Sequence, residues 1–513
     1  MVVDPRALLF VLPPLLLGCP RESPVQAGGE DVPAGGRLVL LHTNDIHSHY
    51  EPTAARWLEG DPEIGGFAAL SSYLETIRAQ ESALLVVDAG DILSGTPLSE
   101  LELDGVVGAE MTGFLADWGY DVWTVGNHEF DQGFDTIAAL VAASAVRPVC
   151  ANIQAPGGGP ALPGLEPARV FERGGVRVGV IGITTPDLQR LVSAETWGQI
   201  ELLDEIQVIQ EQIRLLDPET DLLVLLSHAG LETDRWLAAK VPELDLIVGG
   251  HSHDAVTTPE QVGSTWVVQA GSYARSMGRL DITVQDDAIA SIEGRLVDLR
   301  PDPSWAPATP AVLARLERVS AAVDASYGRV VGSSLAPVTR DSYRQGSLGL
   351  WISTLMLEAT AADVAFYNSG GLRADLPAGE LTYADLYQVL PFGNAPVTLA
   401  MTGAELMKIV KRNAFSEATR ETSSLQCAGL EWSWRPAGGS QEIVTVTVGG
   451  QPLELERSYT VATNSYVSSH IGEILDLPER DIQAHGAAVI ELAERALQAG
   501  PLQPPAARST RVE

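Results

Sequence analysis

The sequence predicts an α/β domain followed by a smaller domain of mixed helices and strands. Short apolar runs that suit buried strands recur along the first 300 residues, and stretches with helical spacing separate several of them. The chain has 513 residues, which exceeds the usual size of one domain, and four prolines between positions 301 and 310 interrupt regular structure. We therefore expect two domains joined by a linker.

The first domain is expected to span residues 37–300 and to alternate strands with helices. Each expected strand is a short apolar run, and polar or helix-compatible residues separate it from the next. The expected strands are 38–41, 84–87, 122–125, 176–181, 222–226, 244–248 and 266–268, and the clearest helices are 67–79 and 203–216. This alternation is typical of an α/β domain.

A linker and the second domain follow. Residues 301–328 are expected to form a linker that ends in a bridging helix. A smaller α+β domain is expected over residues 329–499, with helices at 348–359 and 403–411 and strands at 443–448 and 459–463. Residues 500–513 are rich in Pro and Ala, so we expect a loose tail.

The first 36 residues suggest export. The apolar stretch 7–18 is too short to span a membrane but suits a signal-peptide core. It ends in Leu-Leu-Gly-Cys, which resembles the lipobox of bacterial lipoproteins, whose cysteine, here Cys19, becomes lipidated. We expect residues 1–18 to be a lipoprotein signal peptide and 19–36 to be a flexible tether. Cleavage nearby without lipidation is the alternative.

Composition excludes several classes of partner. The net charge is −34, so non-specific binding to nucleic-acid polymers or to anionic lipid is not expected. No internal apolar run is long enough to span a bilayer, which leaves a lipid anchor as the expected membrane contact. Cys150 and Cys427 are expected to be small buried residues beside strands, and a disulfide between them remains open.

Polar residues gather where the expected strands of the first domain end. In α/β sheets the loops beyond the carboxyl ends of strands build the site, so these residues are expected to meet at one rim. Asp-x-His and His-x-His are expected to place two ligands on one side of an extended loop. A lone His after a strand is usually a capping or core residue, but the joint pattern predicts a metal site. The segments are Asp45-Ile46-His47, Asp88-Ala89-Gly90-Asp91, Gly126-Asn127-His128-Glu129, Ser227-His228 and Gly250-His251-Ser252-His253.

The order of these motifs resembles that of the calcineurin-like metallophosphoesterases. The second domain adds Asn368-Ser369-Gly370-Gly371-Leu372-Arg373 and Pro391-Phe392-Gly393-Asn394, which are similar to motifs of the bacterial 5′-nucleotidase family. The resemblance covers roughly residues 37–500. That family includes UDP-sugar hydrolases and 2′,3′-cyclic-nucleotide phosphodiesterases, and the resemblance implies that the first domain is a two-sheet sandwich flanked by helices.

The resemblance also implies a centre of two divalent metal ions. Imidazole, carboxylate and amide oxygen together suit Zn²⁺, Mn²⁺, Co²⁺ or Fe²⁺ rather than Ca²⁺ or Mg²⁺. Many nucleotidases carry Gln or Asn where this chain has His253, and histidine there is similar to the general phosphodiesterase pattern. The implied ligands are Asp45, His47 and His253 for the first ion, Asn127, His228 and His251 for the second, and Asp91 as the bridge.

Catalytic and substrate-binding residues are implied in the same way. Two ions would clamp a phosphoryl group and activate a hydroxide for in-line attack on phosphorus. His128 matches the catalytic histidine of the family, and Asp131 would orient it unless it only caps a turn. The matching substrate-binding residues are Arg344, Asn368, Arg373 and Phe392. A surface salt bridge for Arg344, an ordered Gly-Gly turn for Asn368 and a core position for Phe392 are the alternatives.

These observations predict an exported phosphoesterase of the bacterial cell envelope or periplasm that hydrolyses nucleotides as a 5′-nucleotidase does. Alternatives are a 2′,3′-cyclic-nucleotide phosphodiesterase, a broad-specificity phosphoesterase, a sulfur-oxidation relative with two manganese ions, and a lipoprotein that binds a ligand without turnover. The family's second base-stacking aromatic follows a Gly-Gly-Asp-Gly segment, which is absent after Asn464-Ser465-Tyr466. We therefore expect weak selectivity among bases.

Overall fold

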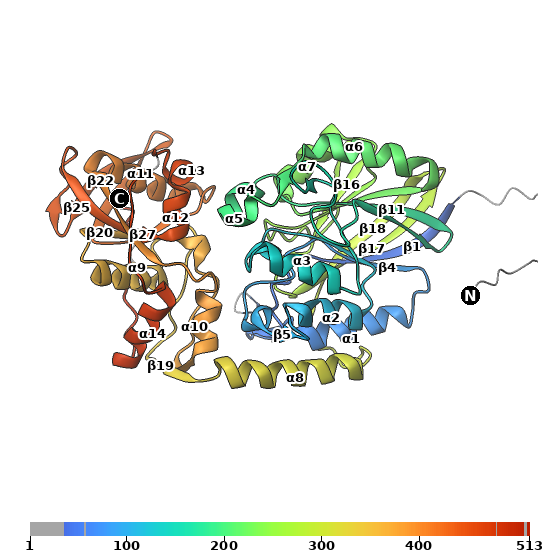
Figure 1. Cartoon of the computed structure of the whole chain (residues 1–513), viewed down its shortest axis with the longest axis horizontal. Coiled ribbons are helices and arrows are strands. Elements are labelled where there is room, and N and C mark those ends of the chain that lie inside the picture. Colours follow the sequence, from blue (N-terminus) through green and yellow to red (C-terminus); the bar gives the residue numbers. More distant parts are fainter. Residues whose placement is uncertain (1–34, 56–57, 479, 507–509, 513) are drawn as a thin grey trace, which may run out of the picture. The chain divides into compact units, whose positions relative to one another are not determined.

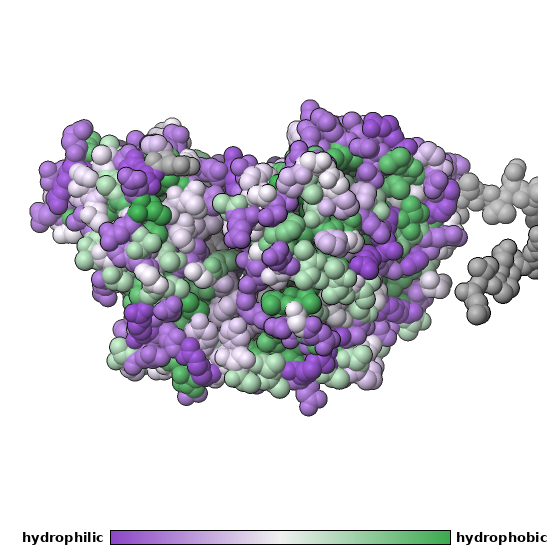
Figure 2. Space-filling view, in the orientation of Figure 1, coloured by the Kyte–Doolittle hydropathy of each residue, from purple (hydrophilic) through white to green (hydrophobic). Residues whose placement is uncertain are grey.

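The computed structural model describes residues 35–513 except 56–57, 479, 507–509 and 513 (Figure 1). Residues 35–513 form one compact unit. The expected signal peptide, Cys19 and nearly all of the expected tether lie outside the described residues. Within the described part of the chain, no helix combines the length and the apolar character needed to cross a membrane. Hydrophilic residues cover much of the face shown in Figure 2, in keeping with the net charge of −34.

Two six-stranded mixed sheets form the first half of this unit. The strands that carry the polar motifs are parallel neighbours, because β1 pairs with β4 and β4 with β7 in one sheet, while β13 pairs with β14 in the other. The first sheet has the order β18 (Ala288–Asp298), β17 (Ser276–Gln285), β1 (Gly35–Thr43), β4 (Leu84–Asp88), β7 (Val122–Thr124) and β8 (Pro148–Val149). The second has the order β10 (Ala168–Arg173), β11 (Val176–Ile183), β13 (Leu222–Ser227), β14 (Leu246–Gly249), β16 (Thr265–Gln269) and β15 (Glu260–Val262).

Alternation along the strands explains how the sheets stack. In β1, Leu38 and Leu40 belong to the core between the sheets, which also contains Val224 of β13. The intervening Val39 and Leu41 belong to the core under the helices. Side chains alternate between the two faces of a strand, so both faces of each sheet are buried. The predicted two-sheet sandwich flanked by helices is confirmed.

Helices cover the outer faces of both sheets. The first sheet packs against α1 (Phe67–Arg78), α2 (Ala109–Trp118) and α3 (Phe134–Ala143), which contribute apolar residues to its outer core. The second sheet packs against α6 (Glu205–Leu216) and α7 (Leu231–Lys240). Asp204 caps α6 by accepting a hydrogen bond from the amide of Gln207, which fixes where that helix begins.

The second half of the unit is built on a five-stranded sheet. Helices α9 (Ser347–Thr360) and α14 (Val489–Ala499) share a core with one of its faces, and α11 (Gly403–Thr419) shares a core with the other. Thr402 and Glu405 form a capping box that starts α11 where predicted, but the helix runs eight residues beyond the predicted 411. The strand order is β23 (Leu425–Ala428), β20 (Val364–Asn368), β27 (Ser458–Asn464), β22 (Pro396–Thr402) and β28 (Gln483–Ala484).

Helix α8 (Pro310–Tyr327) is the expected bridging helix, and it is anchored to the first half of the unit. Its residues Val312 and Val319 belong to the core under α1 and α2. Its Arg315 forms a 2.7 Å ion pair with the buried Glu110 of α2, and Figure 1 shows α8 running beside that helix. Gly328 ends the helix, and its amide donates to Asp324 O at 3.0 Å.

The cysteines and the end of the chain complete the fold. Cys150 and Cys427 are both buried and free, so the disulfide left open by the sequence does not form. The expected loose tail makes backbone hydrogen bonds in its described part. The amide of Leu502 donates to Ser333 O at 2.8 Å, and the amide of Trp434 donates to Thr510 O at 2.9 Å.

A fully buried carboxyl lies where α7 packs on the second sheet. Asp234 has no exposed surface, and its Oδ2 lies so near Gly249 that a Cβ there would sit 2.1 Å from it. Burial raises the pKa of Asp234 to about 8, although the hydroxyl of Ser227 and the charge of His228 lower it. The carboxyl is therefore neutral in the folded protein near pH 7, whereas an unfolded aspartate ionises near pH 4.

Replacement of Asp234 by Asn should make the stability of the metal-free protein less sensitive to pH. A pKa that folding raises stabilises the folded state fully below the unfolded value, and that contribution is lost as pH rises through about 8. Between pH 5 and 8 the wild type should lose up to about 1.4 kcal/mol of unfolding free energy per pH unit relative to Asp234→Asn. Urea unfolding of both proteins at these pH values measures the difference, and parallel pH dependences would contradict it.

Candidate metal centre

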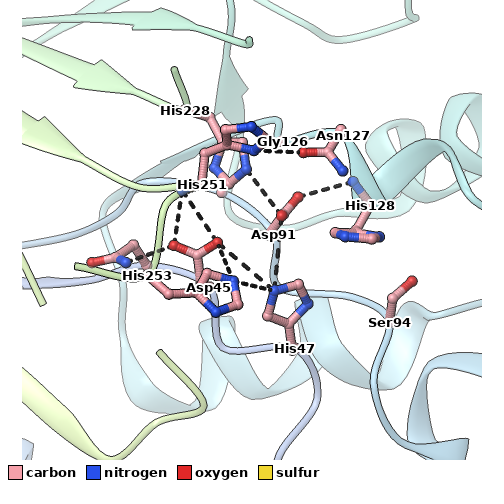
Figure 3. Close-up of polar contacts among 12 residues, drawn as sticks. Asp45, His47, Asp91, Ser94, Gly126, Asn127, His128, His228, His251 and His253 are labelled. Atoms are coloured by element: carbon pink, nitrogen blue, oxygen red, sulfur yellow. Dashed lines mark hydrogen bonds and ion pairs between the residues drawn. The ribbon is translucent and has the colours of Figure 1, made fainter. Parts of the chain in front are cut away.

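The carboxyl ends of five strands bring the predicted ligands together. Strands β1, β4 and β7 lead into the loops that carry Asp45, Asp91 and Asn127, and β13 and β14 lead into those that carry His228 and His251. Figure 3 shows these side chains converging from separate loops. His42, by contrast, is buried on β1 away from this cluster, with its ring against Gly278.

The first group of donors consists of Asp45, His47 and His253, whose ligand atoms lie within 4.8 Å of one another. Asp45 Oδ1 lies 3.2 Å from His253 Nε2 and 3.7 Å from His47 Nε2. The two imidazole nitrogens are 3.1 Å apart. Donors bound to one ion at roughly 2.0–2.2 Å are spaced about 3–3.5 Å apart, so this triangle suits a single divalent ion.

The second group consists of Asp91, His228 and His251, with Asn127 beside them. Asp91 Oδ2 lies 3.0 Å from His228 Nε2, and His251 Nδ1 lies 2.9 Å from Asn127 Oδ1. The same Asp91 oxygen is 3.8 Å from His47 Nε2 of the first group. A carboxylate that faces both groups occupies the position required of a bridge between two ions.

Backbone carbonyls prepare two imidazoles to bind metal. His47 Nδ1 lies 3.0 Å from Leu93 O, and His228 Nδ1 lies 2.7 Å from Ala89 O. A carbonyl only accepts hydrogen bonds, so each Nδ1 must carry a proton, which leaves each Nε2 to face the cluster. His228 Nε2 is buried and lies 3.0 Å from Asp91 Oδ2, where either a metal ion or a second proton can compensate the carboxylate.

The ligand loops are not extended, contrary to the prediction. Five proposed ligands have left-handed backbone conformations, with φ of 50° at Asp45, 49° at His47, 57° at Asp91, 74° at His251 and 60° at His253. Such conformations cost non-glycine residues of the order of 1 kcal/mol or more each and gather at functional sites. Left-handed backbone, and not the alternation of side chains in a strand, therefore brings these pairs of residues together.

Two carboxylates behind the ligands hold these loops in place. Glu129 accepts hydrogen bonds from the amides of Asp91 at 3.1 Å, Leu93 at 3.1 Å and Gly126 at 2.7 Å. Asp88 accepts from the amide of Gly90 at 2.9 Å and from the Thr43 hydroxyl at 2.6 Å. Both residues stand within the motifs, but the motifs do not show that Glu129 joins its own loop to the amides of Asp91 and Leu93, or that Asp88 accepts from the Thr43 hydroxyl.

The charges in this cluster depend strongly on one another. Burial raises the pKa of the Asp91 carboxyl, but the neighbouring imidazoles of His228 and His128 outweigh it and hold the pKa well below its usual range. Burial lowers the pKa of His228, yet Asp91 and Asp45 raise it to about 10. Without a metal ion, a proton on His228 therefore supplies the positive charge that the buried carboxylates need.

His128 and Asp131 form the predicted pair. His128 Nδ1 lies 2.7 Å from Asp131 Oδ2, and the backbone amide of His128 donates to Asp91 Oδ1 at 2.9 Å. Burial lowers the pKa of His128, but the charges of Asp131 and Asp91 raise it above its usual value. His128 also forms a third cluster of possible donors with His47 and Asp91, so geometry alone allows it to be a ligand.

A pocket of about 820 Å³ adjoins both donor groups. Asp91, Asn127, His128, His251 and His253 contribute to its wall, together with Asn368, Arg373 and Phe392 from the second half of the unit. The Phe392 ring is stacked with that of His128 at a centroid distance of 5.6 Å, and the Arg373 guanidinium lies 5.8 Å from its centroid. Phe392 is thus partly exposed in the pocket and not a core residue.

Arg344 is the predicted substrate-binding residue that does not line this pocket. Its side chain is exposed, and its backbone amide donates to Asp341 Oδ1 at 2.9 Å.

Arg340, which the motifs did not point to, donates to Leu372 O at 3.2 Å beside Arg373. Burial lowers the pKa of His49 to about 3, and the charges of Arg275, Arg373 and Arg340 add to this effect. Positive charge therefore gathers beside the centre although the protein is acidic.

Tyr466 and His470 also line the pocket. Their rings are stacked at a centroid distance of 4.4 Å, and both belong to the segment where the expected Gly-Gly-Asp-Gly sequence is absent. His470 Nδ1 lies 2.8 Å from Tyr466 O, which fixes the imidazole on the tyrosine. An aromatic surface other than Phe392 is therefore present in the pocket.

Two family models match the chain in the order that the motifs suggested. A model of calcineurin-like phosphoesterases matches residues 38–255, and a model of 5′-nucleotidase C-terminal domains matches residues 328–476. Similar proteins extend over both parts. A 5′-nucleotidase of Vibrio cholerae is 27% identical over 487 residues, which cover 84% of this chain and 84% of the relative.

Solved structures show the same arrangement of the polypeptide. The crystal structure of a 5′-nucleotidase precursor from Thermus thermophilus matches with a TM-score of 0.80 and 26% identity, covering 93% of this chain and 99% of that one. The sulfate thiohydrolase SoxB from Thermus thermophilus matches with a TM-score of 0.75 and 20% identity, covering 94% and 99%. At that identity the second match is a likeness of fold alone.

Proposed function

Because this chain belongs to the calcineurin-like phosphoesterases that carry a 5′-nucleotidase C-terminal domain, we propose that it hydrolyses nucleotide phosphoesters with two divalent metal ions. The observation that carries the proposal is the pair of adjacent donor groups, with Asp91 3.8 Å from His47 of the first group, that open into one pocket with Arg373. A substrate panel on the metal-loaded protein, with phosphate release as the readout, tests it. Absence of release from every phosphoester would refute it.

The donor set fits two ions of the Zn²⁺, Mn²⁺, Co²⁺ or Fe²⁺ class. Each group combines two imidazoles with oxygen donors, and this mixture favours such ions over Ca²⁺ or Mg²⁺. When bound, the ions would polarise the phosphoryl group and lower the pKa of the attacking water. We assign Asp45, His47 and His253 to one ion, Asn127, His228 and His251 to the other, and Asp91 to both.

The chain's own residues would then stabilise the developing charge. Asp131 accepts a hydrogen bond from Nδ1–H of His128, and Nε2 of that ring therefore points away from the carboxylate. A protonated His128 would stabilise negative charge on the phosphoryl oxygens or on the leaving oxygen. Asp131 keeps the ring protonated by offering it a hydrogen-bonded negative partner.

Residues of the second half would hold the substrate. The planar guanidinium of Arg373 suits an oxyanion, and its place in the pocket wall puts it near the donor groups. Asn368 Oδ1 accepts from Asn464 Nδ2 at 2.7 Å, which fixes its amide at the edge of the same pocket. The Phe392 ring would stack on a base or another flat group.

Other activities are less well supported. His253 favours a cyclic phosphodiesterase or a broad-specificity phosphoesterase as the second candidate, because it gives the first group the general phosphodiesterase pattern. A sulfur-oxidation enzyme rests only on a likeness of fold. Ligand binding without turnover is less consistent with a complete donor set. Release of phosphate from 2′,3′-cyclic and 5′ nucleotides in parallel separates these candidates.

Substitutions at Asp91 and His128 should have different effects. Asp91→Asn should nearly abolish activity and reduce bound metal, because both ions lose their shared negative charge. His128→Ala should keep both ions and lose turnover by about 10²–10⁴-fold, as expected when a charge-stabilising or proton-transferring group is removed. Metal analysis by mass spectrometry beside kcat measurements distinguishes the two. Loss of an ion in His128→Ala would make His128 a ligand.

Base selectivity should be weak, and Phe392 should account for most of it. Stacking of a base on an aromatic contributes about 1–3 kcal/mol, so Phe392→Ala should lower kcat/KM for AMP, GMP and UMP by roughly 5- to 100-fold. The fall for an aryl phosphate should be smaller, and wild-type values for all four substrates should lie within about a hundredfold. A wider wild-type preference that Tyr466→Ala abolishes would instead identify Tyr466 as a second base-binding face.

We also propose export and lipid anchoring through Cys19, on the strength of the Leu-Leu-Gly-Cys sequence that ends a short apolar stretch. Two acyl signals together anchor a protein stably, whereas a single chain binds only marginally. Metabolic labelling with a fatty-acid analogue in a bacterial host should tag the wild type and not Cys19→Ser. Equal labelling of both proteins, or of neither, would contradict lipidation.

A further inference from the structure

Ser94 shares the carboxylate oxygen that holds His128. Its hydroxyl donates to Asp131 Oδ2 at 2.5 Å, and the same oxygen accepts from His128 Nδ1 at 2.7 Å. A carboxylate only accepts hydrogen bonds, so both contacts have a single possible direction once Asp131 is ionised. In Figure 3, Ser94 lies below His128 and to the right of His47.

The backbone around Ser94 fixes the direction of its hydroxyl. Ser94 has a left-handed conformation with φ of 63°, which is unusual for a residue with a Cβ atom. On one side, the amide of Leu93 donates to Glu129 Oε1 at 3.1 Å, and on the other, the hydroxyl of Thr96 donates to Ser48 O at 2.7 Å. Leu93 and Thr96, on either side of Ser94, are thus hydrogen-bonded to the loops of the metal centre. Ser94 itself is only 9% exposed.

We propose that Ser94 is a positioning residue for His128, acting through Asp131. The carboxylate of Asp131 has torsional freedom that one hydrogen bond from His128 does not remove, and the second bond from Ser94 restricts it. The segment that carries Asp91 and Ser94 and the pair His128–Asp131 are then held in a fixed position relative to each other. This inference rests on the proposed function, in which His128 stabilises charge during phosphoester hydrolysis.

Kinetics of single and double variants test the inference. Ser94→Gly removes the hydroxyl and suits the left-handed backbone, so it should fold, and Ser94→Ala repeats the test with a Cβ retained. Each should lower kcat about tenfold, the scale of one hydrogen bond to a charged group, with KM changed less than twofold and metal content unchanged. Asp131→Ala, which removes the shared acceptor, should lower kcat further, and Ser94→Gly should then cost nothing more in the double variant.

A different pattern would overturn the inference. Ser94 also lines the pocket. If it contacted the substrate directly, its substitution would raise KM, and the effects of the substitutions at Ser94 and Asp131 on kcat/KM would multiply in the double variant. An unchanged kcat in Ser94→Gly would equally refute it. Ser99→Ala is the matched control. It removes a nearby buried hydroxyl that lies 2.7 Å from the Ser48 hydroxyl and not beside Asp131. Its kcat should stay within twofold of the wild type.

A spectroscopic measurement separates failure of this inference from failure of the proposed function. The His128 Nδ1 proton should give a protected, downfield resonance in zinc-loaded protein, assigned by its loss in His128→Ala. In Ser94→Gly that resonance should broaden or shift, whether or not any phosphoester is hydrolysed. An unchanged resonance would overturn the positioning role, whereas an inactive wild type with the expected shift would overturn only the proposed function.

Discussion

Burial of carboxylates and imidazoles at one rim of the sandwich is the constraint on which the site depends. Asp45 and Asp91 are 0% and 1% exposed, and an isolated buried charge costs several kcal/mol unless it is compensated. The surrounding structure serves this burial. Glu129 and Asp88 hold the loops through backbone amides, and carbonyl groups fix the imidazole tautomers. Divalent ions would complete the compensation that a proton on His228 provides in their absence.

The same arrangement explains how an acidic protein can attract an anionic substrate. The net charge of the chain is −34, whereas the charges of Arg275, Arg373 and Arg340 all act on His49 beside the centre. Bound cations would add to this local positive field. Substrate binding therefore depends on the charges within the pocket, and the sign of the whole protein matters less.

Local pattern was sufficient to predict elements such as β1 and α11 but not their assembly. The alternating apolar run of β1 identifies a strand, and the capping box at Thr402 identifies where α11 begins. Strand pairing is a long-range property. Strand β1 lies between β4 and β17, and β17 begins more than 200 residues after β1 ends. The two-sheet arrangement came from the resemblance for that reason. The length of α11 and the attached tail depend on tertiary contacts that no local signal records.

The residues proposed as metal ligands lie together in the structure where one motif contains several of them. Asp45, His47 and His253 meet as the resemblance implied, although left-handed backbone and not strand alternation orients them. Arg344 does not line the pocket, because a match of residue type does not give the direction of a side chain. Ser94, Glu129 and Arg340 were missed because their partners belong to other loops, and only the folded chain brings those loops together.

The most direct measurement of the central claim is the number and position of bound metal ions. Crystals grown with Mn²⁺ and measured at its absorption edge should show two anomalous peaks per chain. One should lie within bonding distance of Asp45, His47 and His253, the other within that of Asn127, His228 and His251, with an Asp91 oxygen reaching both. A single peak, or a second peak at another place, would contradict a dinuclear centre built on Asp91.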